Sequence, residues 1–191
     1  MEQIYIEDKT FDNIDFKENP LKKGEYENCD FINCDFSNSD LSDIRFSDCH
    51  FVDCNLSLTK LIGTVLQDIK FKECKMLGLH FDDCHEFGLS FSFESCSLNH
   101  SSFYKTKIKK TTFKNSQLQE VDFTECVLNN SVFDNCDLTE ATFYNTNIEK
   151  TDFRTSENYS IDPENNRIKK AKFSFPDVTG LLDKYDIEIE S

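Results

Sequence analysis

The sequence predicts a solenoid, a narrow rod in which short repeats stack around one shared core. A large apolar residue recurs at every fifth position, and a small residue stands two positions before it. A period of five matches neither the α-helix nor the extended strand, so the chain must turn regularly within each repeat. Only 38% of the 191 residues are hydrophobic and Trp is absent, which suits a thin, repetitive core better than a conventional globule.

The large apolar residues form two unbroken series separated by a two-residue phase shift. The first series is Phe11, Phe16, Leu21, Tyr26, Phe31, Phe36, Leu41, Phe46, Phe51, Leu56, Leu61, Leu66, Phe71, Met76 and Phe81. The second series is Phe93, Leu98, Phe103, Ile108, Phe113, Leu118, Phe123, Leu128, Phe133, Leu138, Phe143, Ile148 and Phe153. Because these 28 positions use 15 of the 19 Phe residues, we interpret them as the inward positions of the rod.

The small residues of the repeat include all nine cysteines. They are Cys29, Cys34, Cys49, Cys54, Cys74, Cys84, Cys96, Cys126 and Cys136. We interpret them as buried thiols that act as small hydrophobes. Two alternatives stay open: a disulfide among the stacked Cys34, Cys54 and Cys74, which a cytoplasmic compartment disfavours, and a metal site of His80, His85 and Cys84. The second alternative lacks any established zinc spacing.

Both ends of the rod need a cover, because an open coil exposes unpaired backbone. Residues 1–10, with Ile4 and Ile6 in register, are expected to form an N-terminal cap. The segment 159–166 reads as an irregular loop with Asp162-Pro163 as its turn. For residues 174–191 we expect a helix with Ser174 as its N-cap, followed by a strand in which Ile187 and Ile189 alternate with acidic residues.

The repeat resembles that of the pentapeptide-repeat family, as the segments CDFIN, CDFSN, SDLSD, VDFTE and CDLTE illustrate. The resemblance covers about residues 10–173. It implies an all-β fold, a right-handed quadrilateral β-helix with four repeats per coil and a short C-terminal α-helix. Residues twenty apart would then stack at ~4.8 Å. We expect one domain over 1–191, with a cap (1–10), a first column (11–84), a phase break (85–92), a second column (93–173) and a C-terminal cap (174–191).

Gly88 in the break and the segment Gly180–Ile187 resemble features of the Qnr and MfpA quinolone-resistance group. In that group the C-terminal end joins two rods into a dimer, and the acidic rod binds DNA gyrase as a mimic of duplex DNA. The resemblance therefore implies a homodimer and a type II topoisomerase as partner. The residues expected at the dimer interface are Phe173, Phe175, Val178, Leu181, Leu182, Tyr185, Ile187 and Ile189.

The charge pattern fits an acidic rod, with a formal net charge of -15. Between Asn115 and Glu149 the chain has no Lys or Arg. The candidate partner-binding acidic face consists of Glu120, Asp122, Glu125, Asp134, Asp137 and Glu140. Two features oppose simple mimicry. One is a basic band, formed by Lys105, Lys107, Lys109, Lys110 and Lys114, and the other is the unbroken frame, which predicts no projecting loops.

The sequence contains no Gly-rich phosphate loop, nucleophile elbow or His-centred triad, so we predict no catalytic residues, no cofactor and no metal. It also lacks a signal peptide and an apolar membrane span, which favours a cytoplasmic protein without membrane binding. Its charge disfavours direct nucleic-acid binding. The leading hypothesis is a non-enzymatic acidic rod that binds DNA gyrase or topoisomerase IV. The alternative is a structural or scaffold rod that binds an unrelated protein through outward apolar residues, such as Ile32 with Val52 or Leu58 with Leu77.

Overall fold

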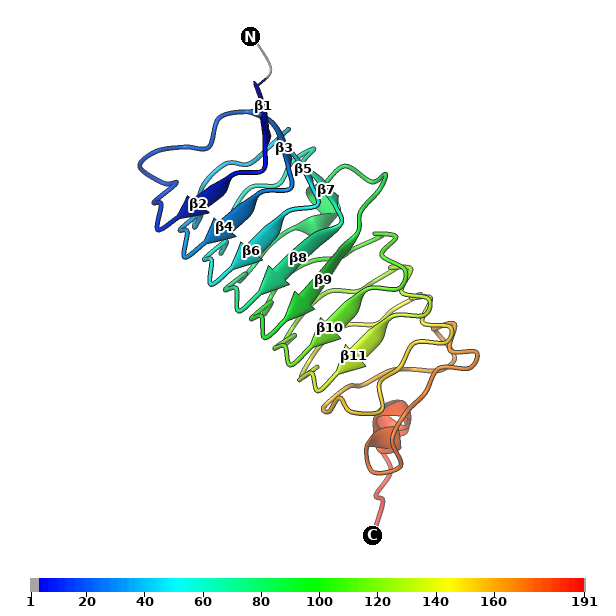
Figure 1. The fold of residues 1–191 in the computed structure, drawn as a ribbon. Helices are drawn as coiled ribbons and strands as arrows, with labels where there is room; N and C mark the ends of the chain where they lie inside the picture. Colours follow the sequence, from blue (N-terminus) through cyan, green and yellow to red (C-terminus); the bar gives the residue numbers. More distant parts are fainter. Residues whose placement is uncertain (1–3, 191) are drawn as a thin grey trace.

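The computed structural model describes residues 4–190 as a four-sided rod of stacked coils, with the two chain ends at opposite ends of the rod (Figure 1). All strand pairs are parallel, and they form a four-stranded sheet, β1-β3-β5-β7, and a seven-stranded sheet, β2-β4-β6-β8-β9-β10-β11. The strands are β1 (Ile4–Glu7), β2 (Thr10–Asp12), β3 (Gly24–Glu27), β4 (Asp30–Ile32), β5 (Arg45–Ser47), β6 (His50–Val52), β7 (Val65–Gln67), β8 (Ile69–Lys72), β9 (Phe91–Glu94), β10 (Thr112–Lys114) and β11 (Val132–Asp134). Isolated parallel bridges such as Asp15 to Asp35 join the coils elsewhere.

The chain turns at corners that adopt the left-handed backbone conformation. The second residue after most centres has a positive φ, as at Asn13 (53°), Asn33 (52°) and Asn135 (54°); the exceptions among the two series are Glu18, Lys23, Asp83 and Thr155. Asn and Asp reach this region more readily than other non-glycine residues, because their short side chains bond to nearby backbone. The polar corners therefore bend the chain after every five residues, and four corners complete one coil.

One column of the core is a continuous stack of aromatic rings. Successive ring centroids lie 4.7–5.5 Å apart. The rings are those of Phe11, Phe31, Phe51, Phe71, Phe93, Phe113, Phe133, Phe153 and Phe173. Stacked aromatic pairs of this kind contribute ~0.5–1.5 kcal/mol each beyond the area they bury. Since the stack crosses the phase break, the two columns form one rod.

The four faces of the rod are numbered here by their inward columns. Face 1 lies over the column that starts at Phe11, face 2 over the column of Phe16, face 3 over that of Leu21 and face 4 over that of Tyr26. Every twentieth residue after one of these centres lies on the same face. Across the break the step from one coil to the next is 22 residues instead of 20. In the second column, Phe93, Leu98, Phe103 and Ile108 start faces 1 to 4 in the same order. Each residue between two centres therefore has a defined face and axial level.

All nine cysteines are buried and unbridged, as the repeat predicted. Seven of the nine thiols donate to carbonyl oxygens of the preceding coil, as from Cys54 Sγ to Phe31 O at 3.3 Å; Cys84 and Cys126 do not. Thr64, at an equivalent inward position, donates its hydroxyl to Leu41 O at 2.8 Å. Burial raises the pKa of both Cys49 and Cys126 to about 12. These thiols thus serve as packing groups that also satisfy the backbone.

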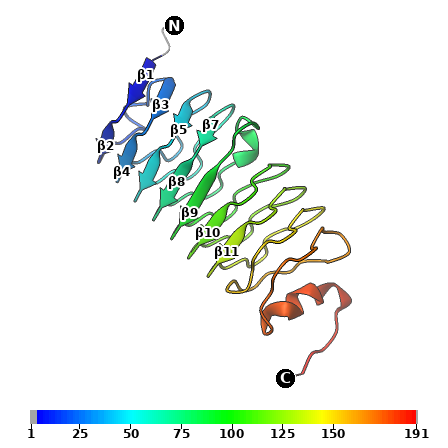
Figure 2. The same cartoon turned by 45° about the vertical axis from the view of Figure 1, so that its right-hand side comes forward.

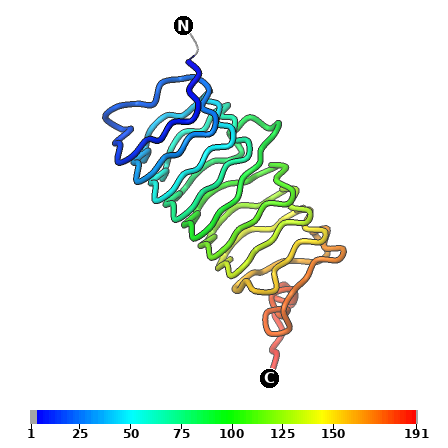
Figure 3. The backbone as a smooth tube through the Cα atoms, viewed as in Figure 1, coloured from blue at the N-terminus to red at the C-terminus, as the bar shows by residue number. Residues whose placement is uncertain are grey.

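The phase break distorts a single side of the rod. β8 pairs directly with β9, with Ile69 opposite Phe91 and Phe71 opposite Phe93, so the two additional residues must lie in the segment between the short 3-10 helix η1 (Phe81–Asp83) and β9. This segment (green) extends beyond the neighbouring coils, and residues 17–23 (blue) do the same near the N-terminus (Figures 1 and 3). The expectation that no loop projects is therefore wrong at these two places.

The side chains at the break explain how the core stays closed there. Phe91 occupies an inward position that holds smaller residues elsewhere, such as Ile69 opposite it, and its ring centroid lies 5.3 Å from that of Phe81. Phe87 at the tip of the projecting segment is 73% exposed. Gly88 has a φ of 82°, which only glycine adopts readily. Gly88 therefore lets the chain turn within the break at little steric cost.

The C-terminal cap is helical but differs from the prediction. It consists of two short 3-10 helices, η2 (Asp177–Leu181) and η3 (Asp183–Tyr185), rather than an α-helix (Figure 2). Pro176, not Ser174, precedes η2, and residues 187–190 form no strand. The β-branched Val178 and Thr179 followed by Gly180 are poor α-helix formers, which accounts for the tighter and shorter turns.

The segment 159–166 is an irregular loop with a turn at 163–165, as predicted, and it also serves as a docking platform for this cap. Tyr159 and Ile161 are buried over the end of the core, and the amide of Ile161 donates to Gly180 O at 2.9 Å. Lys184 of η3 forms ion pairs with Asp162 at 2.7 Å and Glu164 at 2.6 Å. Of the predicted caps, residues 1–3 and Ser191 lie outside the described residues. No helix within 4–190 has the length and hydrophobicity needed to cross a membrane.

Candidate functional site

The predicted acidic residues lie on three consecutive faces of the second column. Glu120, Asp137 and Glu140 share face 2, where Gln117, Asp137 and Glu157 form one bridged row. Asp122 and Glu125 lie on face 3, and Asp134 lies on face 1 in β11. The candidate surface is therefore not a single face, because it continues around two corners. Faces 2 and 3 carry most of it.

Glu157, Asp162 and Glu164 extend this acidic surface toward the C-terminal end, and the sequence analysis did not include them. Glu157 lies directly above Asp137 in the face 2 row. Asp162 and Glu164 follow the face 3 row, although the ion pairs with Lys184 neutralise part of their charge. Adding twenty to Asp137 would have identified Glu157 from sequence alone, and adding forty to Asp122 would have identified Asp162, but no predicted acidic position leads to Glu164 in this way.

Asp137 is the most strongly ionised carboxylate of face 2. Partial burial opposes its ionisation, but hydrogen bonds from Asn158 (2.9 Å), Thr139 (2.6 Å) and Gln119 (2.6 Å) outweigh that effect and lower its pKa to about 2. It therefore keeps its negative charge at any physiological pH. Its oxygens are also held in place by these donors, so the charge has a defined position on the surface.

The other acidic residues are held less tightly. Glu120 faces His100 on the preceding coil at 3.2 Å, and Glu125 faces Lys105 at 3.7 Å. Both glutamates are exposed corner residues with left-handed φ values of 55°. Exposed ion pairs of this kind contribute little stability, ~0–1 kcal/mol. A partner with stronger positive charge could displace them at low cost.

The predicted basic band does not exist as one patch. Lys105 pairs with Glu125 beside face 3, and Lys114 on face 1 pairs with Glu94 at 2.8 Å. Lys107, Lys109 and Lys110 lie instead on face 4, where a bridged row connects Lys107 through Val127 and Asn147 to Arg167. The five lysines are neighbours in sequence but are divided among three faces, because the chain turns between them.

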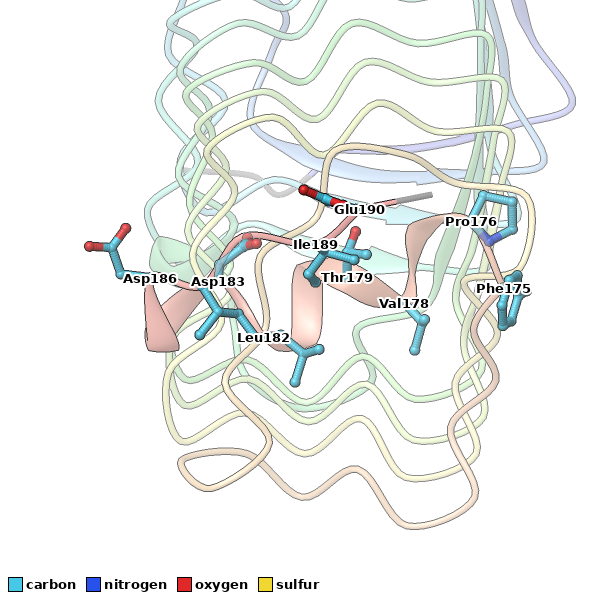
Figure 4. Close-up of a pocket in the computed structure, with 10 residues that line it drawn as sticks. Phe175, Pro176, Val178, Thr179, Leu182, Asp183, Asp186, Ile189 and Glu190 are labelled. Atoms are coloured by element: carbon cyan, nitrogen blue, oxygen red, sulfur yellow. The ribbon is translucent and has the colours of Figure 1, made fainter.

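The C-terminal cap carries an open groove of about 1020 Å³. Figure 4 shows Val178 on η2 and Leu182 directly after it, with the terminal segment of Ile189 and Glu190 running beside η2. Six of the eight predicted interface residues are exposed here. They are Phe175, Val178, Leu182, Tyr185, Ile187 and Ile189.

The two remaining interface residues belong to the core of their own chain. Phe173 stacks on Phe153 at 5.5 Å, and Leu181 packs partly buried against the core. They hold the cap on the rod and so are less available to a partner. Phe175 is 92% exposed, which is exceptional for a side chain of this size and marks the apolar end of the groove.

Residues 4–190 hold no group of three or more His, Cys, Asp or Glu side chains arranged to bind a metal ion. Of the three residues of the alternative metal site, Cys84 is buried, His80 faces Asp82 at 3.4 Å and His85 lies against the ring of Phe87. The three side chains therefore have different partners.

Comparison with known proteins supports the fold. The family model described as "Pentapeptide repeat region" matches residues 24–92 and 89–161. A trypsin-treated variant of the plasmid-mediated fluoroquinolone resistance protein QnrB1 is similar with a TM-score of 0.62 and 17% identity, over 95% of this chain and 99% of that chain. Full-length QnrB1 is similar with a TM-score of 0.56 and 18% identity, over 96% and 100%. A search of curated proteins finds no match.

Proposed function

This chain belongs to the pentapeptide-repeat family, and we propose that it is a non-enzymatic binding protein whose acidic faces bind a type II topoisomerase, DNA gyrase or topoisomerase IV, in place of duplex DNA. The fold is the all-β solenoid that the repeat predicted, and its similarity to QnrB1 supports the fold alone at 17–18% identity. The proposed partner rests on the resemblance to the Qnr and MfpA group and on the charge of faces 2 and 3.

The spacing of carboxylates on faces 2 and 3 is the observation that carries this proposal. Eight carboxylates lie on the three coils between residues 117 and 165, without a Lys or Arg of these coils on either face. With coils stacked at ~4.8 Å, this corresponds to one carboxylate per ~1.8 Å of axis, close to the charge spacing of ~1.7 Å in a DNA duplex. Ion pairs with Lys184 and Lys105 lower the net charge of this surface below that count. The eight carboxylates are those of Glu120, Asp122, Glu125, Asp137, Glu140, Glu157, Asp162 and Glu164.

The proposal includes a homodimer joined at the C-terminal caps. Exposed Phe175, Val178 and Leu182 line one groove at the C-terminal end of the rod, whereas a strand caps the other end. An exposed apolar end of this kind favours contact with a second copy. An end-to-end dimer would place two acidic surfaces on one longer rod. That length is what a mimic of an extended duplex requires.

A supercoiling assay with purified gyrase tests the topoisomerase proposal. The native protein is expected to inhibit supercoiling at micromolar concentration. Glu120→Lys with Glu140→Lys should weaken inhibition by about tenfold, since both changes put positive charge on face 2. Asp53→Lys with Glu73→Lys is the matched control, because this stacked corner pair lies on face 1 of the first column, and it should change inhibition less than about twofold. Absence of both inhibition and a complex would exclude this function.

Light scattering tests the dimer separately. The native chain should have twice the mass of one chain, and Val178→Asp with Leu182→Asp should halve it by placing charge in the groove. Ile62→Asp provides a control, because Ile62 is 58% exposed on face 3 of the first column, far from the cap. A native chain of single mass would remove the dimer from the proposal without affecting topoisomerase binding.

A scaffold role with an unrelated protein partner is the second candidate. Ile32 and Val52 are direct neighbours in the sheet and half-buried on face 1, where the repeat otherwise places polar residues. Leu58 is 59% exposed on face 2, its amide donates to Leu77 O at 2.9 Å, and its side chain lies near Gly78. A chain that fails the gyrase assay but is captured through these residues would have this role instead.

A further inference from the structure

Face 4 reverses its charge at the phase break. Before the break its outward residues, counted from the N-terminal cap strand β1 through β7, include six acidic residues and one basic residue, Arg45. In the second column they include seven basic residues and one acidic residue, Glu149. The seven are Lys107, Lys109, Lys110, Lys150, Arg167, Lys169 and Lys170. In a chain with a net charge of -15, this basic stripe on a single side is the strongest departure from the overall charge.

The basic stripe is unpaired within the described chain. None of its seven side chains has a carboxylate of residues 4–190 within ion-pair distance, whereas nine other basic residues do. All seven are exposed. Lys150 and Lys170 also stack twenty residues apart, an arrangement in which like charges repel. The stripe thus carries electrostatic repulsion that an anionic partner would relieve.

Three lysines of the stripe occupy unfavourable backbone positions. Lys110, Lys150 and Lys170 are corner residues with φ values of 62°, 60° and 62°. Asn130 stands at the same corner one coil above Lys110, with φ of 60°, and Asn is the residue type better suited to this conformation. The lysines are therefore not explained by the needs of the corner itself. Their side chains project where face 4 meets face 1.

We propose that the basic stripe is a docking site for an acidic peptide segment of a protein partner. From Lys107 to Arg167 the stripe spans three coil steps, or ~14 Å along the rod. In an extended peptide with an acidic residue at every second position, successive carboxylates lie ~6.7 Å apart. About five residues of such a peptide would cover the length of the stripe. This site does not depend on the topoisomerase proposal, because it lies on a different face and attracts the opposite charge.

The neighbouring faces favour a narrow ligand over duplex nucleic acid. Face 1 carries Asp134 and Asp152 beside the stripe, and face 3 carries Asp162 and Glu164 on its other side. Asp152 is paired with Arg154 and Lys172, and Lys184 pairs with both Asp162 and Glu164, so Asp134 is the one of these four carboxylates without such a partner in residues 4–190. One face holds three outward residues per coil, about 10 Å of extended chain. A duplex, whose major groove alone is ~12 Å wide, would bring phosphates against the carboxylates on both flanks. An extended peptide fits between them.

Fluorescence anisotropy with a labelled hexaglutamate peptide tests the site on the full-length chain. The peptide should bind saturably at low salt, and binding should weaken as salt rises because the contacts are ionic. Lys109→Glu with Lys169→Glu should weaken binding by about tenfold. Lys70→Glu with Lys75→Glu is the matched control, because both lysines are exposed, unpaired within residues 4–190 and on faces 1 and 2 of the first column; it should change binding less than about twofold.

A hexaglutamine peptide and a short DNA duplex complete the test. Hexaglutamine should not bind, since it keeps the length but lacks the charge. Equal weakening by both double variants would overturn the proposal, because it would show a general effect of net charge. A duplex that displaces the hexaglutamate peptide at lower concentration than unlabelled peptide does would overturn it in favour of a nucleic-acid ligand. Circular dichroism of each variant should match the native chain, as all four lysines are exposed.

Discussion

The first and second columns share one backbone but differ in both core and surface. In the second column Phe fills faces 1 and 3 while Leu or Ile fills faces 2 and 4; in the first column only face 1 has a uniform residue type. The outward residues of face 4 are mainly acidic before the break and mainly basic after it. The coil tolerates these differences because its geometry depends on a filled interior and polar corners, not on which charges it displays.

This comparison shows where the chain is constrained and where it is free. The Phe stack passes the break with Phe71 and Phe93 at 5.3 Å, so the core is continuous even where the surface changes sign. Inward positions must be large enough to touch the coils on both sides. Outward positions contact mainly solvent, and so they can be used to recognise partners. Four predictions follow the comparison from the core outward.

Removing one ring from each column has the largest expected effect. Phe51→Ala and Phe113→Ala each delete a fully buried ring between two stacked neighbours, and each should lower the free energy of unfolding by about 3–5 kcal/mol. The two values should agree within about 1 kcal/mol if the columns form one rod. Urea unfolding followed by circular dichroism measures both. A difference several times larger would mean that the columns unfold as separate units.

A methyl group added at either cap should destabilise the protein by less than the loss of a core ring. A Cβ at Gly24 would collide with the carbonyl oxygen of Ile4, and one at Gly180 would collide with that of Tyr159. Both neighbours are backbone, so β1 or η2 must shift, at a cost of about 1–3 kcal/mol. Hydrogen exchange should increase at the N-terminal cap of Gly24→Ala and at the C-terminal cap of Gly180→Ala. Exchange that rises along the whole rod would contradict local capping.

A substitution in the break itself should have a smaller effect. A Cβ at Gly88 would meet no atom within 4 Å, so Gly88→Ala introduces only the strain of its φ of 82°. This strain is worth about 1–2 kcal/mol. Thermal unfolding should show a modest decrease in the midpoint with unchanged cooperativity. A loss of stability greater than that of Gly180→Ala would mean that Gly88 makes contacts that the structure does not show.

Acid should affect the second column through two carboxylates. The pKa of Asp137 falls from its ordinary 3.8 to about 2, and hydrogen bonds from Arg154 and Lys172 likewise lower that of Asp152 to about 2. Because folding depresses both values, their stabilisation is fully present above about pH 4 and is lost as the pH falls toward 2. As the pH is lowered across this range, the free energy of unfolding should fall less steeply for Asp137→Asn than for the native chain. An identical slope would show that Asp137 is not held as described.

Much of the fold could be predicted from sequence. The inward series, the burial of all nine cysteines and the position of the break agree with the structure. The C-terminal cap was predicted less well, because Gly180 and the β-branched Val178 and Thr179 favour short 3-10 turns that only docking on Tyr159 and Ile161 stabilises. The repeat pattern does not predict the structure of a chain end, because no further coil pairs with that end.

The candidate surfaces depended more on the tertiary structure. In the sequence, Lys105 and Lys114 belong to one basic band. In the structure they lie on different faces, and each pairs with a carboxylate of a neighbouring coil. The basic stripe of face 4 could have been found by comparing residues twenty apart, which brings Lys107 and Arg167 into one row. Neighbours in the sequence of this protein are usually not neighbours on its surface.

The sequence by itself determined the coil: an apolar centre every five residues must face inward, and polar corners must turn the chain, because both requirements act within a single repeat. The tertiary structure alone decided the ion pairs between coils and the docking of the C-terminal cap. Those features join residues from different coils or from an end without a repeat. Their energies arise only when the coils are stacked.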